Sequence, residues 1–391
     1  MPSRPRETFS AFLRLGLTSF GGPIAHLEYF RREFVERRQW LSDAQFAQLL
    51  AISQFLPGPA SSQLGFGIGL LRGGAAGAIA AFVAFTLPSA LLLLGLATLS
   101  LPLGSGGGAV LLHALKLVAA VVVLDGVVRM ARSLTPDAPR IALALATAGG
   151  VALVGTAWAQ LAAIGVAGVV GALALRPTSE QSAASLPFLA SRGAIVAALT
   201  LFGAGLTLAL AWPVEQASLA ALAAAMWRAG ALVFGGGHVV LPLLEESIVA
   251  SGWLSHEVFL SGYGAAQLVP GPMFSFAAFL GAAVPTGSAA WLGAVVAVLA
   301  IFFPGFLLMA AVLPVWNRVT AQPVAARAVA GINAAVVGLL AAALVNPVLP
   351  AAIMSRWDIA VLALGIIVQR TLHRPTLAVF ALCVLAATWM H

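Results

Sequence analysis

The sequence predicts an all-α polytopic membrane protein made of two inverted-topology repeats, and three observations support that prediction. Of its 391 residues, 61% are hydrophobic and 8% are charged, whereas a soluble domain carries about a quarter charged residues. Several apolar runs exceed the roughly 20 residues that a spanning helix needs, and none shows the alternation typical of an outer-membrane barrel strand. The chain also repeats its own glycine and proline motifs after 213 to 216 positions.

The repeat is defined by two pairs of matching motifs. FGGP at residues 20–23 returns as FGGG at residues 234–237, and QFLPGP at residues 54–59 returns as QLVPGP at residues 267–272. A unit of this length indicates two related halves that pack together, because solenoid units run to roughly 20–50 residues. We assign residues 1–176 to the first repeat, 177–213 to a linker and linking transmembrane helix, and 214–391 to the second repeat.

The charges between the motifs indicate that the halves are inverted. The stretch after FGGP is rich in arginine, with Arg31, Arg32, Arg37 and Arg38. The matching stretch after FGGG has no lysine or arginine and carries Glu245, Glu246 and Glu257. By the positive-inside bias, the first stretch is cytoplasmic and the second lies outside.

This topology predicts two re-entrant hairpins and four crossings in each repeat. The apolar stretch before Arg31 is about 15 residues, too short to cross twice, so we expect it to enter and leave by the cytoplasmic face with FGG at its tip. The segment at residues 41–71 does the same, with PGP at its tip. Crossings follow at residues 73–101, 109–128, 141–155 and 158–175. A linking helix at residues 193–212 leads to the second repeat, so the N-terminus is predicted inside and the C-terminus outside.

Glycine and proline suit the hairpin tips for a physical reason. A backbone that turns inside the hydrocarbon layer must be buried in protein or line a wet cavity, and broken helix ends at that depth build the substrate sites of many transporters. The polar residues beside the turns either contact a ligand or satisfy the broken backbone. The candidate substrate-binding residues at the tips are Gly21, Gly22, Gln54, Pro57, Gly58, Pro59, Ser61, Ser62, Gly235, Gly236, Gln267, Pro270, Gly271, Pro272 and Ser275.

Two pairs of charged residues recur in both repeats. Arg14 and Arg228 lie in short apolar arms, where an arginine near the membrane centre costs at least roughly 2.5–3.5 kcal/mol. Each either binds an oxyanion through its bidentate fork or snorkels to the interface or a carbonyl. Glu33 and Glu246 are candidates to carry a coupled proton, and the alternative is a solvated or salt-bridged role. Asp125 is expected to pair with Arg129, four residues later on the same helix.

Several other functions are excluded or disfavoured. Cys383 is the only cysteine, so one chain forms no disulfide, and the six histidines have no metal-ligand spacing. No catalytic triad or phosphate-binding motif is present, so we expect neither an enzyme nor a cofactor. The basic residues that give the net charge of +7 are scattered between apolar segments, which argues against nucleic acid binding. Arg14 interrupts the first apolar stretch, so no cleavable signal peptide is expected.

The spacing of these motifs resembles the signature of the chromate ion transporter (CHR) family. Gly22 is followed by Val35 after twelve residues, Trp40 after four more and Pro57 after a further sixteen. The second copy keeps the two glycines, a tryptophan and PGP more loosely, as in the long two-domain form of that family. The resemblance implies a bacterial inner-membrane protein that exports chromate from the cytoplasm, driven by protons or the membrane potential, and so confers chromate resistance.

The residues themselves indicate an inverted-repeat carrier for an oxyanion. Chromate and sulfate are both tetrahedral dianions, so a sulfate or other anion importer, or a passive anion pathway, stays open as the alternative. The expected partners are chromate or sulfate, protons and the lipid bilayer, with a homodimer as the default assembly.

Overall fold

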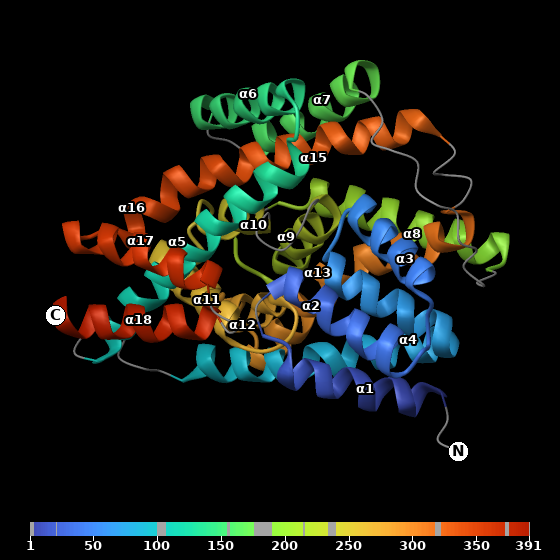
Figure 1. Cartoon of the computed structure of the whole chain (residues 1–391), viewed down its shortest axis with the longest axis horizontal. Coiled ribbons are helices and arrows are strands. Elements are labelled where there is room, and N and C mark those ends of the chain that lie inside the picture. The colour runs from blue at the N-terminus through green and yellow to red at the C-terminus, as the bar shows by residue number, and fades with distance from the viewer. Residues whose placement is uncertain are drawn as a thin grey trace.

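The computed structural model describes residues 4–20, 22–99, 107–154, 157–175, 190–213, 216–233, 240–316, 322–371 and 375–390. Within these ranges the chain folds into helices joined by short connections, and they contain no strand (Figure 1). The predicted all-α class is confirmed.

The first repeat contains short helices that lead into a long, broken helix and three further helices. The elements are α1 (Arg4–Thr18), α2 (Gly22–Arg31), the π-helix η1 (Arg32–Arg37), α3 (Asp43–Phe55), α4 (Ala60–Thr98), α5 (Gly107–Leu134), α6 (Ala138–Val154) and α7 (Ala157–Ala174). α4 is two helical arms, because Gly73 and Gly74 have non-helical backbone angles, with φ of −142° and +61°. The break falls where the sequence predicts the boundary between the PGP hairpin and the first crossing.

The second repeat follows the same order after the linking helix α8 (Arg192–Ala211). Its elements are α9 (Leu219–Leu232), α10 (Val240–Ile248), α11 (His256–Leu268), η3 (Met273–Ser275), α12 (Phe276–Ala283), α13 (Ala290–Val312), η4 (Leu313–Val315), α15 (Pro323–Ala343), η5 (Leu344–Val348), α16 (Leu349–Ala352), α17 (Arg356–Thr371) and α18 (Pro375–Met390). α9 corresponds in order to α1, α11 to α3, α15 to α5, α17 to α6 and α18 to α7.

Matching serines begin the two helices that lead to the PGP turns. The Ser42 hydroxyl accepts a hydrogen bond from the Gln45 backbone N–H at 3.2 Å, and the Ser255 hydroxyl accepts one from the Val258 N–H at 3.4 Å. The Gln45 side-chain oxygen in turn accepts a hydrogen bond from the Ser42 backbone N–H, which completes a capping box. Because such caps satisfy amides that have no partner within the helix, α3 and α11 begin at equivalent positions.

The surface of the described chain is that of a multi-pass membrane protein. Four helical stretches are long and apolar enough to cross a membrane: Ala60–Thr98, Arg192–Ala211, Ala290–Val315 and Ala326–Asn346. Only 6% of the apolar window of α8 is buried inside the protein. Leu145, Leu153 and Leu173 on α6 and α7 are 68%, 89% and 79% exposed. Long apolar helices with an exposed apolar exterior of this kind need lipid to cover them.

The two repeats are interleaved. α5 of the first repeat packs against α17 and α18 of the second, and α15 of the second repeat packs against α6 and α7 of the first (Figure 1). The last two helices of each repeat are therefore held by the other repeat.

Polar pairs at two levels fix the direction of α5 relative to α17. His113 Nε2 lies 2.9 Å from Asp358 Oδ1, and twelve residues later on both helices Arg370 Nε lies 3.1 Å from Asp125 Oδ1. Twelve residues of helix rise about 18 Å. Since residue numbers increase together along both helices, α5 and α17 run in the same direction.

Pairs of glycines let helices cross closely at the same place in each repeat. Gly69 and Gly77, on the two arms of α4, lie backbone to backbone, and a Cβ on either would collide with the carbonyl oxygen of the other. Gly281 of α12 and Gly293 of α13 form the same contact in the second repeat. The arms after each PGP turn therefore fold back against the next helix without room for a side chain.

We predict that Gly69→Ala destabilises the protein, whereas Gly95→Ala on the same helix does not. The added methyl group at Gly69 would force the arms apart, at a cost on the order of 1–3 kcal/mol. Nothing lies within 4 Å of a Cβ at Gly95, so there the better helix propensity of alanine gains up to ~1 kcal/mol. Thermal unfolding of the two detergent-purified variants measures this, and equal Tm values would contradict the proposed close crossing.

Candidate functional site

The two PGP turns are held by reciprocal hydrogen bonds between the repeats. The Gly58 N–H donates to the Val233 carbonyl oxygen at 2.7 Å, and the Gly271 N–H donates to the Ser19 carbonyl oxygen at 3.0 Å. Ser19 and Val233 are matching residues, each directly before its FGG motif. Each turn is therefore bonded to the end of the first helix of the other repeat.

The turns also pack against the residues that directly follow matching prolines of the opposite repeat. Gly58 contacts Gly305, which follows Pro304 in α13, and Gly271 contacts Ser89, which follows Pro88 in α4. Both glycines have positive φ, +131° and +108°, in the region that side chains disfavour. Both are buried, so the turns lie inside the protein and not in bulk water.

One side chain that the sequence reasoning did not select joins the first turn to the second repeat. Gln63 Nε2 donates to the Pro57 carbonyl oxygen at 2.9 Å and to the Gly305 carbonyl oxygen at 3.0 Å. Gln63 is fully buried, and its counterpart in the second repeat is Phe276. The sequence feature that could have identified Gln63 is that it is a single amide side chain within an otherwise mostly apolar helical segment.

The predicted polar residues at the turns divide into three groups. Ser275 donates its hydroxyl to the Pro272 carbonyl oxygen at 2.6 Å, and Gln267 directs its amide at the Met273 sulfur at 2.8 Å, so both are occupied within their own turn. Ser61 and Ser62 are buried on the first arm of α4. Gln54 is exposed on α3.

Among the predicted prolines, Pro59, Pro270 and Pro272 are buried in the turns.

Most residues of the predicted FGG tips lie outside the part of the chain that the structure describes. Gly22 begins α2, whereas Gly21, Gly235 and Gly236 lie outside the residues that the structure describes.

The matching arginines differ in burial. Arg14 is exposed on α1, whereas Arg228 on α9 is half-buried. The Arg228 Nε atom is buried without a hydrogen-bond partner among the residues described. Equivalent positions in the two repeats therefore present their guanidinium groups in different surroundings.

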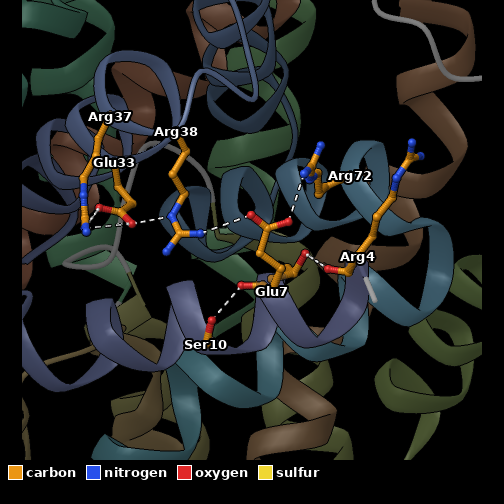
Figure 2. Close-up of polar contacts among 8 residues, drawn as sticks. Arg4, Glu7, Ser10, Glu33, Arg37, Arg38 and Arg72 are labelled. Atoms are coloured by element: carbon orange, nitrogen blue, oxygen red, sulfur yellow. Dashed lines mark hydrogen bonds and ion pairs between the residues drawn. The ribbon is translucent and has the colours of Figure 1, made fainter. Parts of the chain in front are cut away.

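Glu33 belongs to an ion network near the start of the chain (Figure 2). Its carboxylate accepts from Arg38 Nε at 2.5 Å and from Arg37 Nη1 at 2.9 Å, and Glu7 pairs with Arg38 and Arg72. Burial alone would raise the pKa of Glu33, but the hydrogen bonds and charges of Arg38 and Arg37 outweigh it and hold that pKa below its ordinary value. The network stabilises the junction of α1, η1 and α4.

Trp40 adds an aromatic contact to this network. The guanidinium carbons of Arg38 and Arg72 lie 5.2 Å and 4.9 Å from its ring centroid, distances at which a cation is attracted to an aromatic face. Its ring stacks on Phe34 with centroids 5.0 Å apart.

Glu246 lies in different surroundings from its counterpart Glu33. With Glu245 it lines a cavity of about 320 Å³ between α6, α10 and α15. Burial, with a further contribution from the charge of Glu246, raises the pKa of Glu245 to about 8. The Glu245 carboxyl oxygen lies 3.4 Å from His256 Nδ1. α10 is not one of the four spanning stretches.

The predicted pairing of Asp125 is confirmed and extended. Its carboxylate lies 2.8 Å from Arg129 Nη2 on the same helix, and it also accepts from Arg370 of the second repeat. Asp125 therefore joins the two repeats.

The profile of the chromate transporter family matches residues 6–172 and again residues 220–388. The chain belongs to the chromate transporter family. This is a family of transport proteins and not of enzymes, and the family resemblance indicated by the motif spacing is confirmed. The two matched ranges of this transporter fall on the two sets of helices described above.

Relatives of the transporter match over most of its length. The chromate transport protein of Pseudomonas aeruginosa is 31% identical over 351 residues, which cover 87% of this chain and 80% of the relative. A probable chromate transport protein of Synechococcus elongatus is 29% identical, covering 85% and 82%. The chromate transport protein of Cupriavidus metallidurans is 29% identical, covering 87% and 82%. No solved structure shows a significant match to the chain.

We predict that Glu33→Gln destabilises the transporter in a pH-dependent way. Because the folded pKa is depressed, the ion pairs contribute fully above the unfolded pKa of about 4.3 and are lost as the pH falls through the lower folded value. At pH 7 the loss is on the order of 1–3 kcal/mol, and the difference from wild type shrinks below about pH 4.

Thermal unfolding from pH 3 to pH 8 measures this difference. Glu36→Gln is the matched control, since Glu36 pairs with Arg31 at an exposed site. A Tm difference between wild type and Glu33→Gln that stays constant down to pH 3 would contradict an ionised, paired Glu33.

Proposed function

We propose that this chain is a secondary active transporter that exports chromate from the cytoplasm across the bacterial inner membrane, coupled to protons or the membrane potential, and so confers chromate resistance. Membership of the chromate transporter family supports chromate as the substrate. The observation that carries the transport mechanism is that two buried PGP turns are each hydrogen-bonded to the other repeat. Broken segments from two related halves, meeting in the protein interior, are the substrate-site architecture of inverted-repeat carriers.

The parallel packing of α5 and α17 supports the inverted topology within this proposal. Residues 135–137 join α5 to α6, so α6 starts on the side of the membrane where α5 ends. Asp358, at the start of α17, lies beside His113, near the start of α5. α6 and α17 are counterparts, and these contacts favour opposite starting sides for them.

The membrane potential favours export of an anion. An inside-negative potential contributes ~2.3 kcal/mol per elementary charge per 100 mV, so a dianion that leaves unaccompanied gains about twice that. For proton coupling, the cavity beside Glu245 and Glu246 is a better candidate than Glu33, whose carboxylate is held by two arginines.

We place the substrate among the glycines, prolines and polar residues of the FGG and PGP tips, with Arg228 and Arg14 as the cations that attract it. The unpartnered Nε of Arg228 supports a role for that residue. Sulfate is the alternative substrate, because it has the same shape and charge as chromate.

We predict that Arg228→Ala and Arg14→Ala each reduce chromate flux at least about tenfold, since a hydrogen bond to a charged ligand contributes roughly 1.5–3 kcal/mol, with normal protein abundance. Proteoliposomes loaded with chromate or labelled sulfate, with and without a pH gradient, measure substrate, direction and coupling together. Arg192→Ala is the control, because Arg192 is exposed at the start of α8. Normal flux in both test variants would remove the arginines from the site, and sulfate flux without chromate flux would favour the alternative.

We predict that cysteines introduced as Arg37→Cys and Ser251→Cys are accessible from opposite faces of the membrane. The experiment uses a Cys383→Ala background, which removes the only natural cysteine. An impermeant maleimide should label Ser251→Cys in intact cells and Arg37→Cys only after permeabilisation. Permeabilised cells, in which both sites label, are the control. Labelling of both sites from one face would contradict inversion.

A further inference from the structure

The two repeats place different side chains around the two PGP turns. Around Gly271 the first repeat supplies Ser19, His26 and Ser89, all 0% exposed. The residues at the matching positions of the second repeat, Val233, Val240 and Gly305, have no polar side-chain atoms. The two turns share a backbone arrangement, but only one has a polar lining from these positions.

Ser19 and His26 form one hydrogen-bonded unit with the second turn. The Ser19 carbonyl oxygen accepts from the Gly271 N–H and also lies 3.3 Å from His26 Nε2. A carbonyl oxygen only accepts hydrogen bonds, so Nε2 carries a proton and Nδ1 of the neutral ring is an acceptor. The ring packs edge-on against Phe85 with centroids 5.3 Å apart, which holds it in this orientation.

Both side chains have a polar atom with no hydrogen-bond partner in the described part of the chain. These atoms are the Ser19 hydroxyl and His26 Nδ1, and both residues are fully buried. Buried polar groups in folded proteins are nearly always hydrogen-bonded, because a group without a partner has given up its bonds to water. α2 begins at Gly22, between the two residues, and the first-turn N–H groups of a helix attract anions. The hydrogen bond between the Ser19 carbonyl and the His26 ring therefore holds the residue with the unpaired hydroxyl and the residue with the unpaired ring acceptor next to each other, on either side of the start of α2.

We propose that Ser19 and His26 bind a tetrahedral oxyanion together with one proton, which is shared between His26 Nδ1 and a ligand oxygen. This inference rests on the proposed function and specifies which protonation state of the substrate the transporter recognises. The Ser19 hydroxyl and the first-turn amides of α2 donate to the unprotonated ligand oxygens. Ligand and proton together carry one negative charge instead of two.

This arrangement discriminates between the two candidate anions. Hydrogen chromate forms near neutral pH, whereas hydrogensulfate forms only in strong acid. A buried acceptor that needs a proton from its ligand stays unsatisfied beside sulfate, and sites built around a ligand hydroxyl reject analogues that lack it. Selectivity for chromate then comes from hydrogen-bond complementarity, since size and shape are shared.

No charged side chain competes for this proton in the described surroundings. The hydrogen bond and the ring contact of His26 are to Ser19 and Phe85, which are uncharged. The charged residues of the adjoining elements α1, α2, η1 and α4 are exposed or ion-paired. The exposed ones are Arg4, Arg6, Arg14, Glu28, Arg32 and Glu36, and the ion-paired ones are Glu7, Arg31, Glu33, Arg37 and Arg72.

Calorimetric titration of the purified full chain with chromate and with sulfate tests the proposal. Titrations at pH 8 in buffers of different ionisation enthalpy count the protons taken up. Wild type should take up about one proton with chromate and bind sulfate at least about 30-fold more weakly. His26→Gln should abolish proton uptake and weaken chromate at least about tenfold without changing sulfate affinity. Ser19→Ala should weaken both anions.

Ser53→Ala is the matched control, since Ser53 is 1% exposed and its hydroxyl is already bonded to the Leu50 carbonyl oxygen. It should bind both anions like wild type. His26→Asn provides a second variant if His26→Gln does not elute as a folded protein.

The proposal is overturned if the folded His26 variants bind chromate with wild-type affinity and proton uptake, or if they lose chromate and sulfate equally. Wild-type protein that neither binds nor transports chromate would instead contradict the proposed function. The two failures are therefore distinguishable.

Discussion

The fold depends on one constraint: a backbone that breaks inside an apolar protein must find partners for its amides. Each PGP turn meets this constraint with a carbonyl from the other repeat, Val233 for Gly58 and Ser19 for Gly271. In the described chain the Gly58 and Gly271 amides are bonded only across the repeats, so each turn depends on the other repeat for this partner. The packing of α5 against α17 and α18, and of α15 against α6 and α7, follows the same pattern on a larger scale. The two repeats are one folding unit, because each provides the surface on which the other is completed.

The shared backbone carries different chemistry in its two copies. The first repeat holds Glu33, Glu7 and three arginines in an ion network, whereas the matching Glu246 lies with Glu245 beside a cavity. Ser19 and His26 have apolar counterparts, and so does Gln63, which matches Phe276. Once duplicated halves support each other structurally, a position can change in one copy while the other keeps the common fold. Binding and structural roles can then separate between the repeats.

Much of the fold could be predicted from single residues and their spacing. The helices follow the apolar runs, the break in α4 falls at Gly73 and Gly74, and the pairing of Asp125 with Arg129 follows helical geometry. The cross-repeat contacts could not be predicted, because the partners Ser19 and Gly271 are 252 positions apart and no periodicity connects them. The different burial of Arg14 and Arg228 could not be predicted either, because their sequence surroundings match and the difference arises only from tertiary packing. His26 was missed because a lone histidine in a short apolar segment has no spacing signal.

The shared carbonyl of Ser19 links ligand binding to the contact between the repeats. It accepts from Gly271 of the second repeat and from His26 of the first. If His26 Nδ1 engages an oxyanion and its proton, the ring gains positive character and its Nε2–H donates more strongly to the Ser19 carbonyl, the same oxygen that accepts from Gly271 of the second turn. A ligand shifts a conformational equilibrium only through contacts that differ between the two states. The Ser19 carbonyl meets that requirement, because it is bonded both to the proposed binding residue His26 and to the other repeat. A ligand that contacts α1 alone would not affect the contact between the repeats.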